Sequence, residues 1–294
     1  MSVRAASPRP PDRVVTAVSA RRSTVVDVIR NARDSIAVSL FRCNDPEIFA
    51  ELARATARGV KIEALITARA KGGKEKLRKL WKRLTECGAS VQAYSDAVVK
   101  YHAKYLVADE GPAIVASCNF TRKCFERTCD AIVVTHDPDV ASGLRALMAA
   151  DAERRPVPAA ISSRLIIGPE RARRQLTAFV EQAQSSIRLI DAKLSDPDLV
   201  TLLNARRSGG LTVEVFGSKR LGDLKSHGKI LLIDDRLAVV GALAIAAISL
   251  DFRREVAIVV EEPEAVGDVD RLFRALDAEP TQGRRPTDGE RLAL

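Results

Sequence analysis

The chain has 294 residues, 46% of them hydrophobic, which is enough apolar material for one large domain or two of ordinary size. No apolar run approaches the ~18 residues that span a bilayer, and the N-terminus lacks the apolar segment of a secretion signal, so we expect a cytoplasmic protein. The net charge of +9 lies wholly in residues 1–150, with 25 Lys and Arg against 16 Asp and Glu, while residues 151–294 hold 22 of each, an asymmetry that favours an anionic partner for the first part of the chain.

Strands and helices alternate along the chain, beginning with a short apolar strand at 35–38. Asp45 and Pro46 then form a typical helix start, and the helix is expected to end near Gly59 before a strand at 60–66. The same order recurs 151 residues later, with a strand at 186–189, a helix start at Asp196 and Pro197, a helix end near Gly210 and a strand at 211–215. The chain therefore contains an internal repeat.

The first copy of the repeat contains an additional helix at 74–87 and an additional strand at 90–94. One face of this helix is apolar and the other is basic, with Leu77, Leu80, Trp81 and Leu84 on the first and Lys74, Lys76, Arg78, Lys79, Lys82 and Arg83 on the second. Such a helix either packs on the sheet with a solvated basic face or lies on an anionic membrane surface. The sequence leaves both interpretations open.

A short motif occurs once in each copy, as His102-Ala103-Lys104 with Asp109 and as His227-Gly228-Lys229 with Asp234. The two histidines are 125 residues apart, and an acid follows each of them by 28 residues, Asp130 in the first copy and Glu255 in the second. Each acid opens an apolar run. A repeat that keeps a His, a Lys and an acid in register predicts one site built from two halves.

The residue types of the motif point to phosphoryl chemistry. Alternation along a strand directs the His and the Lys of each motif to the same side. An imidazole is a nucleophile and a proton carrier near neutral pH, and an acid bonded to its far nitrogen fixes the tautomer, as in hydrolase triads. Two such histidines facing one phosphate can divide the work, one attacking while the other protonates the leaving oxygen and later activates water or an alcohol. The lysines supply positive charge for the phosphate.

Two groups of residues have structural interpretations instead. Asp109 and Asp234 stand at strand ends before turns, where a role in the turn is at least as well supported as a chemical one. The five cysteines, in a chain without an export signal, indicate reduced thiols, and the spacings of Cys118, Cys124, Cys129 and His136 fit no common zinc pattern. We therefore predict no metal site and no cofactor.

The doubled pattern His-X-Lys-X4-Asp, followed in the first copy by Ser117-Cys118-Asn119, resembles the phospholipase D superfamily over roughly residues 20–276. The resemblance implies two α/β halves about a pseudo-twofold axis with the site between them. It also implies that His102 is the nucleophile forming a phosphohistidine and that His227 is the acid and base. The remaining implied roles are phosphate contacts for Lys104, Lys229 and Asn119 with support from Ser117, and orientation of the histidines by Asp130 and Glu255.

One departure from the superfamily pattern is clear. The positions of the second copy that correspond to Ser117 and Asn119 hold Ala242 and Ala244. The second half therefore lacks the Ser and Asn of the pattern, and we expect a lopsided phosphate pocket.

The predicted fold class is α/β, with two similar α/β/α-layered halves and the active site between them. The first half is expected at 14–150 and the second at 163–278, joined by a linker at 151–162. Residues 1–13 and 279–294 contain Pro, Arg and Gly and are expected to be disordered.

The favoured function is a metal-independent phosphodiesterase or phosphatidyltransferase acting on phospholipid through a phosphohistidine. One alternative is a nuclease of the same superfamily acting on DNA or RNA, and another is a degenerate relative that only binds phosphodiesters. The partner is accordingly a phosphodiester substrate, with a peripheral contact between residues 74–87 and an anionic membrane as a further hypothesis. The sequence determines neither the headgroup nor the oligomeric state.

Overall fold

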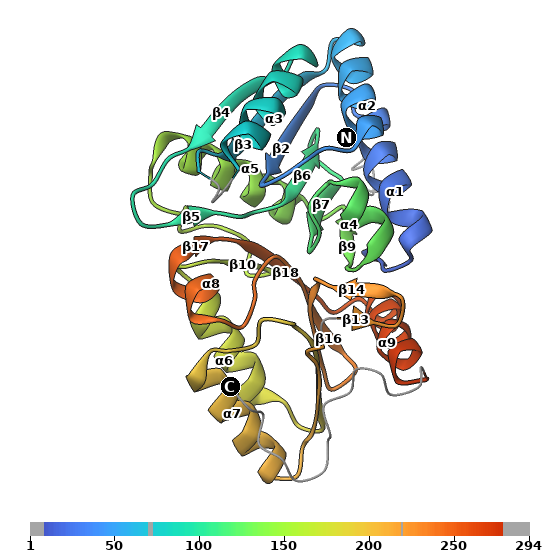
Figure 1. Cartoon of the computed structure of the whole chain (residues 1–294), viewed down its shortest axis with the longest axis vertical. Helices are drawn as coiled ribbons and strands as arrows, with labels where there is room; N and C mark the ends of the chain where they lie inside the picture. Colours follow the sequence, from blue (N-terminus) through green and yellow to red (C-terminus); the bar gives the residue numbers. More distant parts are fainter. Residues whose placement is uncertain (1–8, 70–72, 219, 279–294) are drawn as a thin grey trace, which may run out of the picture.

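The computed structural model describes residues 9–69, 73–218 and 220–278, so the N-terminal residues 1–8 and the C-terminal residues 279–294 that were expected to be disordered lie outside the described part. Figure 1 shows two α/β halves stacked along the long axis of the molecule, each built around its own sheet. The predicted fold class, α/β with two similar halves, is confirmed. Within the described residues, no helix is both long enough and apolar enough to cross a membrane.

The first half contains, in chain order, β1 (Arg13–Val15), α1 (Val18–Asn31), β2 (Ser35–Leu40), α2 (Pro46–Ala57), β3 (Lys61–Thr67), α3 (Lys74–Glu86), β4 (Ser90–Tyr94), β5 (Lys100–Tyr101), β6 (Tyr105–Ala108), β7 (Ala113–Ala116), α4 (Arg122–Arg127), β8 (Thr128–Cys129), β9 (Ile132–Thr135) and α5 (Pro138–Glu153). Its sheet has the order β1-β9-β7-β6-β2-β3-β4. Strands β2, β3 and β4 are parallel, and the others pair antiparallel.

The second half contains β10 (Leu165–Ile167), α6 (Ala172–Gln182), β11 (Ser186–Ile190), α7 (Pro197–Ser208), β12 (Thr212–Phe216), β13 (Arg220–Leu221), β14 (Leu224–Ser226), β15 (Lys229–Ile233), β16 (Leu237–Gly241), α8 (Ala247–Phe252), β17 (Arg253–Arg254), β18 (Val256–Val260) and α9 (Pro263–Ala278). Its sheet has the order β10-β18-β16-β15-β11-β12, which repeats the first sheet without a counterpart of β4.

The helix signals of the repeat act as predicted. The Asp45 side chain accepts a hydrogen bond from Glu47 N at the start of α2, and Asp196 accepts one from Leu199 N at the start of α7. Gly59 and Gly210 follow the two helices with φ of 93° and 96°, the left-handed conformation that glycine adopts without strain.

A repeated ion-pair cluster, which the sequence analysis did not identify, ties three helices of each half together. Arg22 on α1 pairs with Asp45 at the cap of α2 and with Glu126 on α4. In the second half Arg173 on α6 pairs in the same way with Asp196 and Asp251. The clusters therefore hold α4 and α8 in equivalent places.

Three expectations need correction at the edges of the two halves. Residues 9–13 were expected to be disordered, but Asp12 is buried against Arg164, and Arg13 begins β1, which pairs with β9. The linker was expected from residue 151, but α5 continues to Glu153, because its residues Leu147, Ala150 and Asp151 are buried. The apolar stripe of α3 is also narrower than predicted, since Leu80 and Leu84 are buried while Trp81 is 42% exposed.

Strands exchanged between the halves hold the two halves together. Strand β17 of the second half pairs in parallel with β5 of the first, and β8 of the first half pairs in parallel with β14 of the second. The largest hydrophobic core cluster also draws on both halves, including Tyr105, Val133 and Leu144 from one and Ile230 and Phe273 from the other. The boundary between the halves is thus a shared interior.

A buried ion pair fixes one of the exchanged strands. Arg254 on β17 is 5% exposed, and its Nε donates to Asp151 on α5 of the first half at 2.8 Å. Its Nη1 donates to the carbonyl of Gly168 at 2.7 Å and to Glu170 at 2.5 Å. Burial raises the pKa of Asp151 to about 7, although the charge of Arg254 opposes that shift. The ionised form of the Asp151 carboxyl therefore depends on the positive charge of Arg254.

We expect Arg254→Met to lower the free energy of unfolding by about 3–5 kcal/mol, because the change leaves the Asp151 carboxylate buried without its partner. Denaturant unfolding followed by circular dichroism measures this loss. Arg271→Met is the matched control, since Arg271 is exposed and pairs with the neighbouring Asp268, and this change should cost less than about 1 kcal/mol. Equal losses in the two variants would contradict the role of the buried pair.

Candidate active site at the boundary of the two halves

The exchanged strands place each motif histidine beside the other half. His102 follows β5, and its backbone N donates to the carbonyl of Arg254 at 2.9 Å. Gly228, which follows His227, donates its N–H to the carbonyl of Cys129 at 2.8 Å. A Cβ atom at Gly228 would lie 2.7 Å from that same carbonyl oxygen, which explains why glycine stands where the first motif has Ala103.

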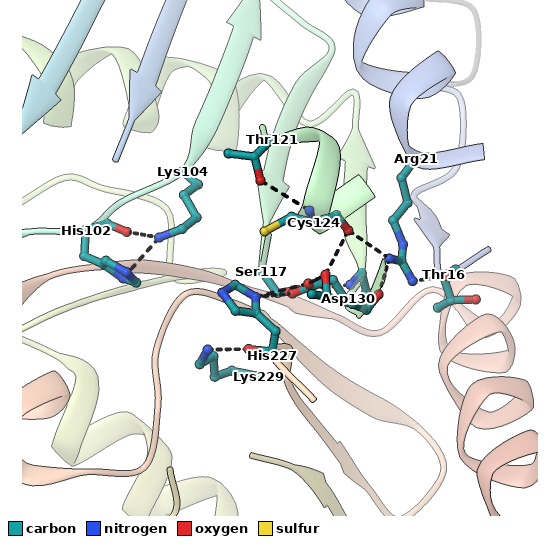
Figure 2. Close-up of polar contacts among 12 residues, drawn as sticks. Thr16, Arg21, His102, Lys104, Ser117, Thr121, Cys124, Asp130, His227 and Lys229 are labelled. Atoms are coloured by element: carbon teal, nitrogen blue, oxygen red, sulfur yellow. Dashed lines mark hydrogen bonds and ion pairs between the residues drawn. The ribbon is translucent and has the colours of Figure 1, made fainter. Parts of the chain in front are cut away.

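Each histidine is bound by the acid of the opposite half. His102 Nδ1 lies 2.6 Å from Glu255 Oε1, and His227 Nδ1 lies 3.1 Å from both carboxylate oxygens of Asp130. Figure 2 shows His227 turned toward Asp130 and His102 close to Lys104. The spacing of 28 residues associates each acid with the histidine of its own copy of the repeat. In the structure, each acid instead contacts the histidine of the other half. With Nδ1 engaged, Nε2 of each ring is the nitrogen left for a substrate.

Side chains of its own half hold the Asp130 carboxylate. Ser117 Oγ donates to Oδ1 at 2.6 Å and Thr128 Oγ1 donates to Oδ2 at 2.5 Å. The buried Arg21 guanidinium fixes β8 by donating to the carbonyls of Thr128 at 2.5 Å and Thr16 at 2.6 Å. Burial raises the pKa of Asp130, but His227 and these hydrogen bonds more than offset it, so the pKa is lower than the usual value. Asp130 is therefore a carboxylate at neutral pH.

Different residues hold Glu255 in the second half. Ser249 on α8 donates its hydroxyl to Glu255 Oε2 and accepts a hydrogen bond from Ala244 N at 3.0 Å. Arg253 Nη1 lies 3.7 Å from Glu255 Oε1. By the offset of 125 residues that relates the two histidines, Ser249 corresponds to Cys124 and Arg253 to Thr128.

Ser249 thus makes the contacts that Ser117 makes in the first half. Ser117 likewise donates to the acid and accepts a backbone N–H, that of Ala131 at 3.0 Å. Ala242 and Ala244 are buried, so the second half has lost the two polar side chains of its loop as expected, but a serine from the following helix supports the acid instead. No spacing in the sequence marks Ser249, because its counterpart is a cysteine.

The motif lysines are buried and lie beside their own histidines. Lys104 is 1% exposed, and its Nζ donates to the carbonyl of His102 at 2.5 Å and lies 3.1 Å from Nδ1 of the same residue. Lys229 donates in the same way to the carbonyl of His227. Burial lowers the pKa of Lys104 to about 7, with Glu255 opposing and Lys229 reinforcing the shift. Because Lys229 belongs to the other half, its charge acts on Lys104 across the boundary between the halves.

The two histidines differ in electrostatic environment. Burial lowers the pKa of His102 well below its ordinary value, and the nearby charges of Lys104, Arg253, Lys229 and Lys193 lower it further. Burial also raises the pKa of Glu255, its partner. His227 is more exposed and is paired with an ionised Asp130. His102 is therefore a neutral imidazole at pH 7.

The remaining predicted site residues fall into two groups. The Asn119 amide is nearly buried, and its Oδ1 has no hydrogen-bond partner within the described part of the chain, so the fold does not use this atom. Asp109 and Asp234 instead organise turns. Asp109 accepts the N–H groups of residues 33–35 and Asp234 those of residues 184–186. Burial raises the pKa of Asp234, but these N–H groups outweigh it and lower the pKa to about 2.

Residues that the sequence analysis missed complete the site. The ring of Phe41 lies 4.4 Å from that of His102 and 5.3 Å from Lys104 Nζ, measured to ring centroids. Lys193 and Arg253 add positive charge beside His102, as the lowered pKa of that histidine indicates. Neither cation belongs to the repeated motif, which is why spacing did not reveal them.

A metal ion would find few ligands here. All five cysteines are buried, and none forms a disulfide within the described residues. Among the described residues, Cys124, Asp130 and His227 bring ligand atoms within 4.8 Å of one another. Asp130 and His227 are already bonded to each other, and the lysines beside them disfavour a cation.

We expect Lys104→Met to raise the pKa of His102, because it removes the charge that, after burial, contributes most to lowering it. NMR titration of the imidazole resonances measures the change, and the chain has only three histidines to assign. Lys79→Met removes an exposed lysine of α3 and should leave the titration unchanged. An unaltered pKa of His102 in Lys104→Met would show that burial alone sets it.

Comparisons with known proteins agree with this geometry. Residues 25–152 match a family model described as cardiolipin synthase, PLD-like domain. No sequence among the curated proteins matches the chain. Among solved structures, a polyphosphate kinase from Porphyromonas gingivalis is similar over 90% of this chain, with 17% identity and a TM-score of 0.73. A phosphatidylserine synthase from Haemophilus influenzae Rd KW20 is similar over 91% of this chain, with 10% identity and a TM-score of 0.69.

These likenesses differ in how much of the other protein they cover. The chain spans 47% of the polyphosphate kinase and 86% of the phosphatidylserine synthase. At such identities they establish the fold. The family model confirms, for residues 25–152, the resemblance inferred from the doubled motif, and this part of the chain matches a PLD-like domain.

Proposed function

We propose that the protein cleaves or transfers phosphodiesters through a covalent phosphohistidine on His102. The observation that carries this proposal is the pair of exchanged contacts, His102 with Glu255 and His227 with Asp130. Each contact engages Nδ1 and leaves Nε2 for the substrate, and two buried lysines stand beside the rings. This arrangement suits an anionic phosphate bound between two imidazoles.

The proposed reaction has two steps. In the first, His102 Nε2 forms a bond to phosphorus while the P–O bond of the leaving group breaks, and protonated His227 gives its proton to the departing oxygen. In the second, His227 removes a proton from water or an alcohol, whose oxygen attacks phosphorus as the P–N bond breaks and His102 regains its electron pair. Lys104, Lys229 and Asn119 would contact the non-bridging oxygens, which carry the charge throughout.

The electrostatics support this division of roles. A nucleophilic imidazole must be neutral, and His102 has the lowered pKa that keeps it so. A general acid must present its ring nitrogen to the leaving oxygen, and the ionised Asp130, 3.1 Å from His227 Nδ1, leaves Nε2 of that ring for this task. The reverse assignment would require a protonated His102 beside the charges of Lys104 and Arg253, which disfavour that form.

For the substrate we favour a phospholipid. The description of the matching family model, cardiolipin synthase, supports this choice, as does the exposed Trp81 among lysines on α3, which suits a peripheral contact with an anionic membrane. A nuclease is the second candidate, because the positive charge concentrated in residues 1–150 also suits a nucleic acid. Assays on phosphatidylglycerol vesicles and on single-stranded DNA distinguish the two.

We expect His102→Ala to abolish turnover of whichever substrate the wild type cleaves, and His227→Ala to slow it by about 10²–10⁴-fold, the usual value of general acid–base help. Rapid quenching with radiolabelled substrate should trap the phosphoryl group on His102. EDTA should leave the rate unchanged, because the lysines supply the charge that a metal would otherwise provide. A phosphoenzyme on His227 would reverse the roles, and activity surviving both substitutions would remove the motif from the mechanism.

We expect Ser249→Ala to reduce turnover by roughly tenfold, because Glu255 loses the hydroxyl that holds it against His102. The double variant Ser249→Ala with Ala242→Ser tests the mechanism, since it moves the serine to the position that the first half uses. Recovery of turnover in the double variant would support the positioning role, as would a shifted pH profile in the single one. An unchanged pH profile with reduced thermal stability would mean that Ser249 serves only the fold.

A further inference from the structure

The aromatic ring of Phe41 lies against the imidazole of His102. Phe41 directly follows β2, and its ring centroid is 4.4 Å from that of His102, with an angle of 56° between the two planes. Aromatic rings at this separation and tilt are in contact. Glu255 meets the same imidazole at Nδ1, at 2.6 Å. Phe41 and Glu255 together therefore restrict the rotation of the His102 ring.

Two cations lie over the ring of Phe41. Nζ of the motif lysine Lys104 is 5.3 Å from the ring centroid, and the guanidinium carbon of Arg42 is 5.0 Å from it. The face of an aromatic ring attracts cations, so both contacts help to hold the ring in place. Phe41 thus touches the histidine and the lysine of the first motif.

Backbone contacts fix the segment that carries Phe41. Cys43 forms an isolated parallel bridge with Phe120, and Asn44 N donates to the carbonyl of Phe120 at 3.2 Å. Phe120 directly follows Asn119, the last residue of the polar loop in the first half. The ring of Phe41 is therefore carried by a segment that is attached to this loop.

The second half repeats the backbone contact of this segment. Ser195 N donates to the carbonyl of Ile245 at 2.9 Å, as Asn44 N donates to that of Phe120. Ser195 follows Asn44 by 151 residues and Ile245 follows Phe120 by 125, which are the two offsets of the repeat. The segments before Asn44 and Ser195 are therefore equivalent.

The equivalence does not extend to the aromatic ring. At the offset of 151 residues, the counterpart of Phe41 is Ala192. Over residues 9–69, 73–218 and 220–278, the contacts between aromatic rings include His102 but not His227. The side chain of His102 is 16% exposed and that of His227 is 28% exposed. Phe41 is thus an apolar cover that one histidine of the pair has and the other lacks.

The charges around His102 indicate how the cover acts. Burial is the first cause of its lowered pKa, and four cations lower it further, Lys104, Arg253, Lys229 and Lys193. Burial also raises the pKa of Glu255, the acid that touches the ring. The face of Phe41 would attract a protonated imidazole, but Arg42 and Lys104 already lie over it and repel a third positive charge. The main effect of Phe41 is therefore to exclude water, which disfavours the charged imidazole.

We propose that Phe41 is a positioning residue that prepares His102, and not His227, for attack on phosphorus. Its ring packs against the neutral imidazole, shields it from water and keeps Nε2 directed at the phosphate. The proposal deepens the proposed function and rests on it. The motif supplies two like histidines, and a phenylalanine outside the motif makes one of them the nucleophile.

NMR titration of the imidazole resonances in Phe41→Ala tests the proposal without a substrate. Removal of the ring admits water, so the pKa of His102 should rise toward its ordinary value. Phe41→Leu keeps part of the apolar volume and should raise the pKa by less, and Phe41→Tyr keeps the ring and should titrate as the wild type does. Circular dichroism confirms that each variant is folded. An unchanged or lowered pKa of His102 in the folded Ala and Leu variants would overturn the proposal.

Phe179→Ala is the matched control, because Phe179 on α6 is another half-buried phenylalanine and packs against the core cluster of the second half. This change should reduce thermal stability and leave the titration of His102 unchanged. If Phe179→Ala raised the pKa of His102 as much as Phe41→Ala does, the shift would reflect a loosened fold, and the positioning role of Phe41 would be contradicted.

Cleavage of bis(p-nitrophenyl) phosphate separates this proposal from the function on which it rests. Phe41→Ala should lower kcat by about 10- to 100-fold, as expected for a misplaced nucleophile. It should also move the acid limb of the kcat/KM profile to higher pH, because attack requires neutral His102. Turnover with an unmoved acid limb in Phe41→Ala would leave the proposed function in place and overturn the role of Phe41. A raised pKa of His102 in a protein without phosphodiesterase activity would support the shielding by Phe41 and contradict the proposed function.

Discussion

The exchange of acids between the two halves is the constraint on which the rest of the structure depends. Glu255 reaches His102 because β17 leaves its own half to pair with β5, and Asp130 reaches His227 because β8 pairs with β14. Neither half contains a complete histidine–acid pair. The shared core and the buried Arg254 are consequences of the same arrangement, since both keep the exchanged strands in register.

The two halves reach the same geometry with different residues. Asp130 is held by Ser117 and Thr128, and Glu255 by Ser249 and Arg253. Because the carboxylates are buried, each must receive hydrogen bonds or charge to remain in place. The loss of one serine from a loop is offset by a serine on the adjacent helix, and the two acids retain their positions relative to the rings.

Because different residues surround the two histidine–acid pairs, the two histidines also differ in their chemistry. The charges of Lys104, Arg253 and Lys193 help to keep His102 neutral, while Asp130 keeps its ionised form beside His227. A symmetric fold thus supplies one imidazole suited to attack and one suited to proton transfer. Burial amplifies the difference, because charges interact more strongly where water is excluded.

The repeat in the sequence determined the α/β class, the helix caps at Asp45 and Asp196, and the set of His, Lys and acid residues in the site, because these follow from local spacing and capping chemistry. Only the tertiary structure decided which acid meets which histidine, since strand exchange between halves leaves no mark in spacing. It likewise decided the roles of Ser249 and Arg253, which both contact Glu255. The counterparts of Ser249 and Arg253 in the other half, Cys124 and Thr128, are of different chemical types, so the repeat does not reveal them.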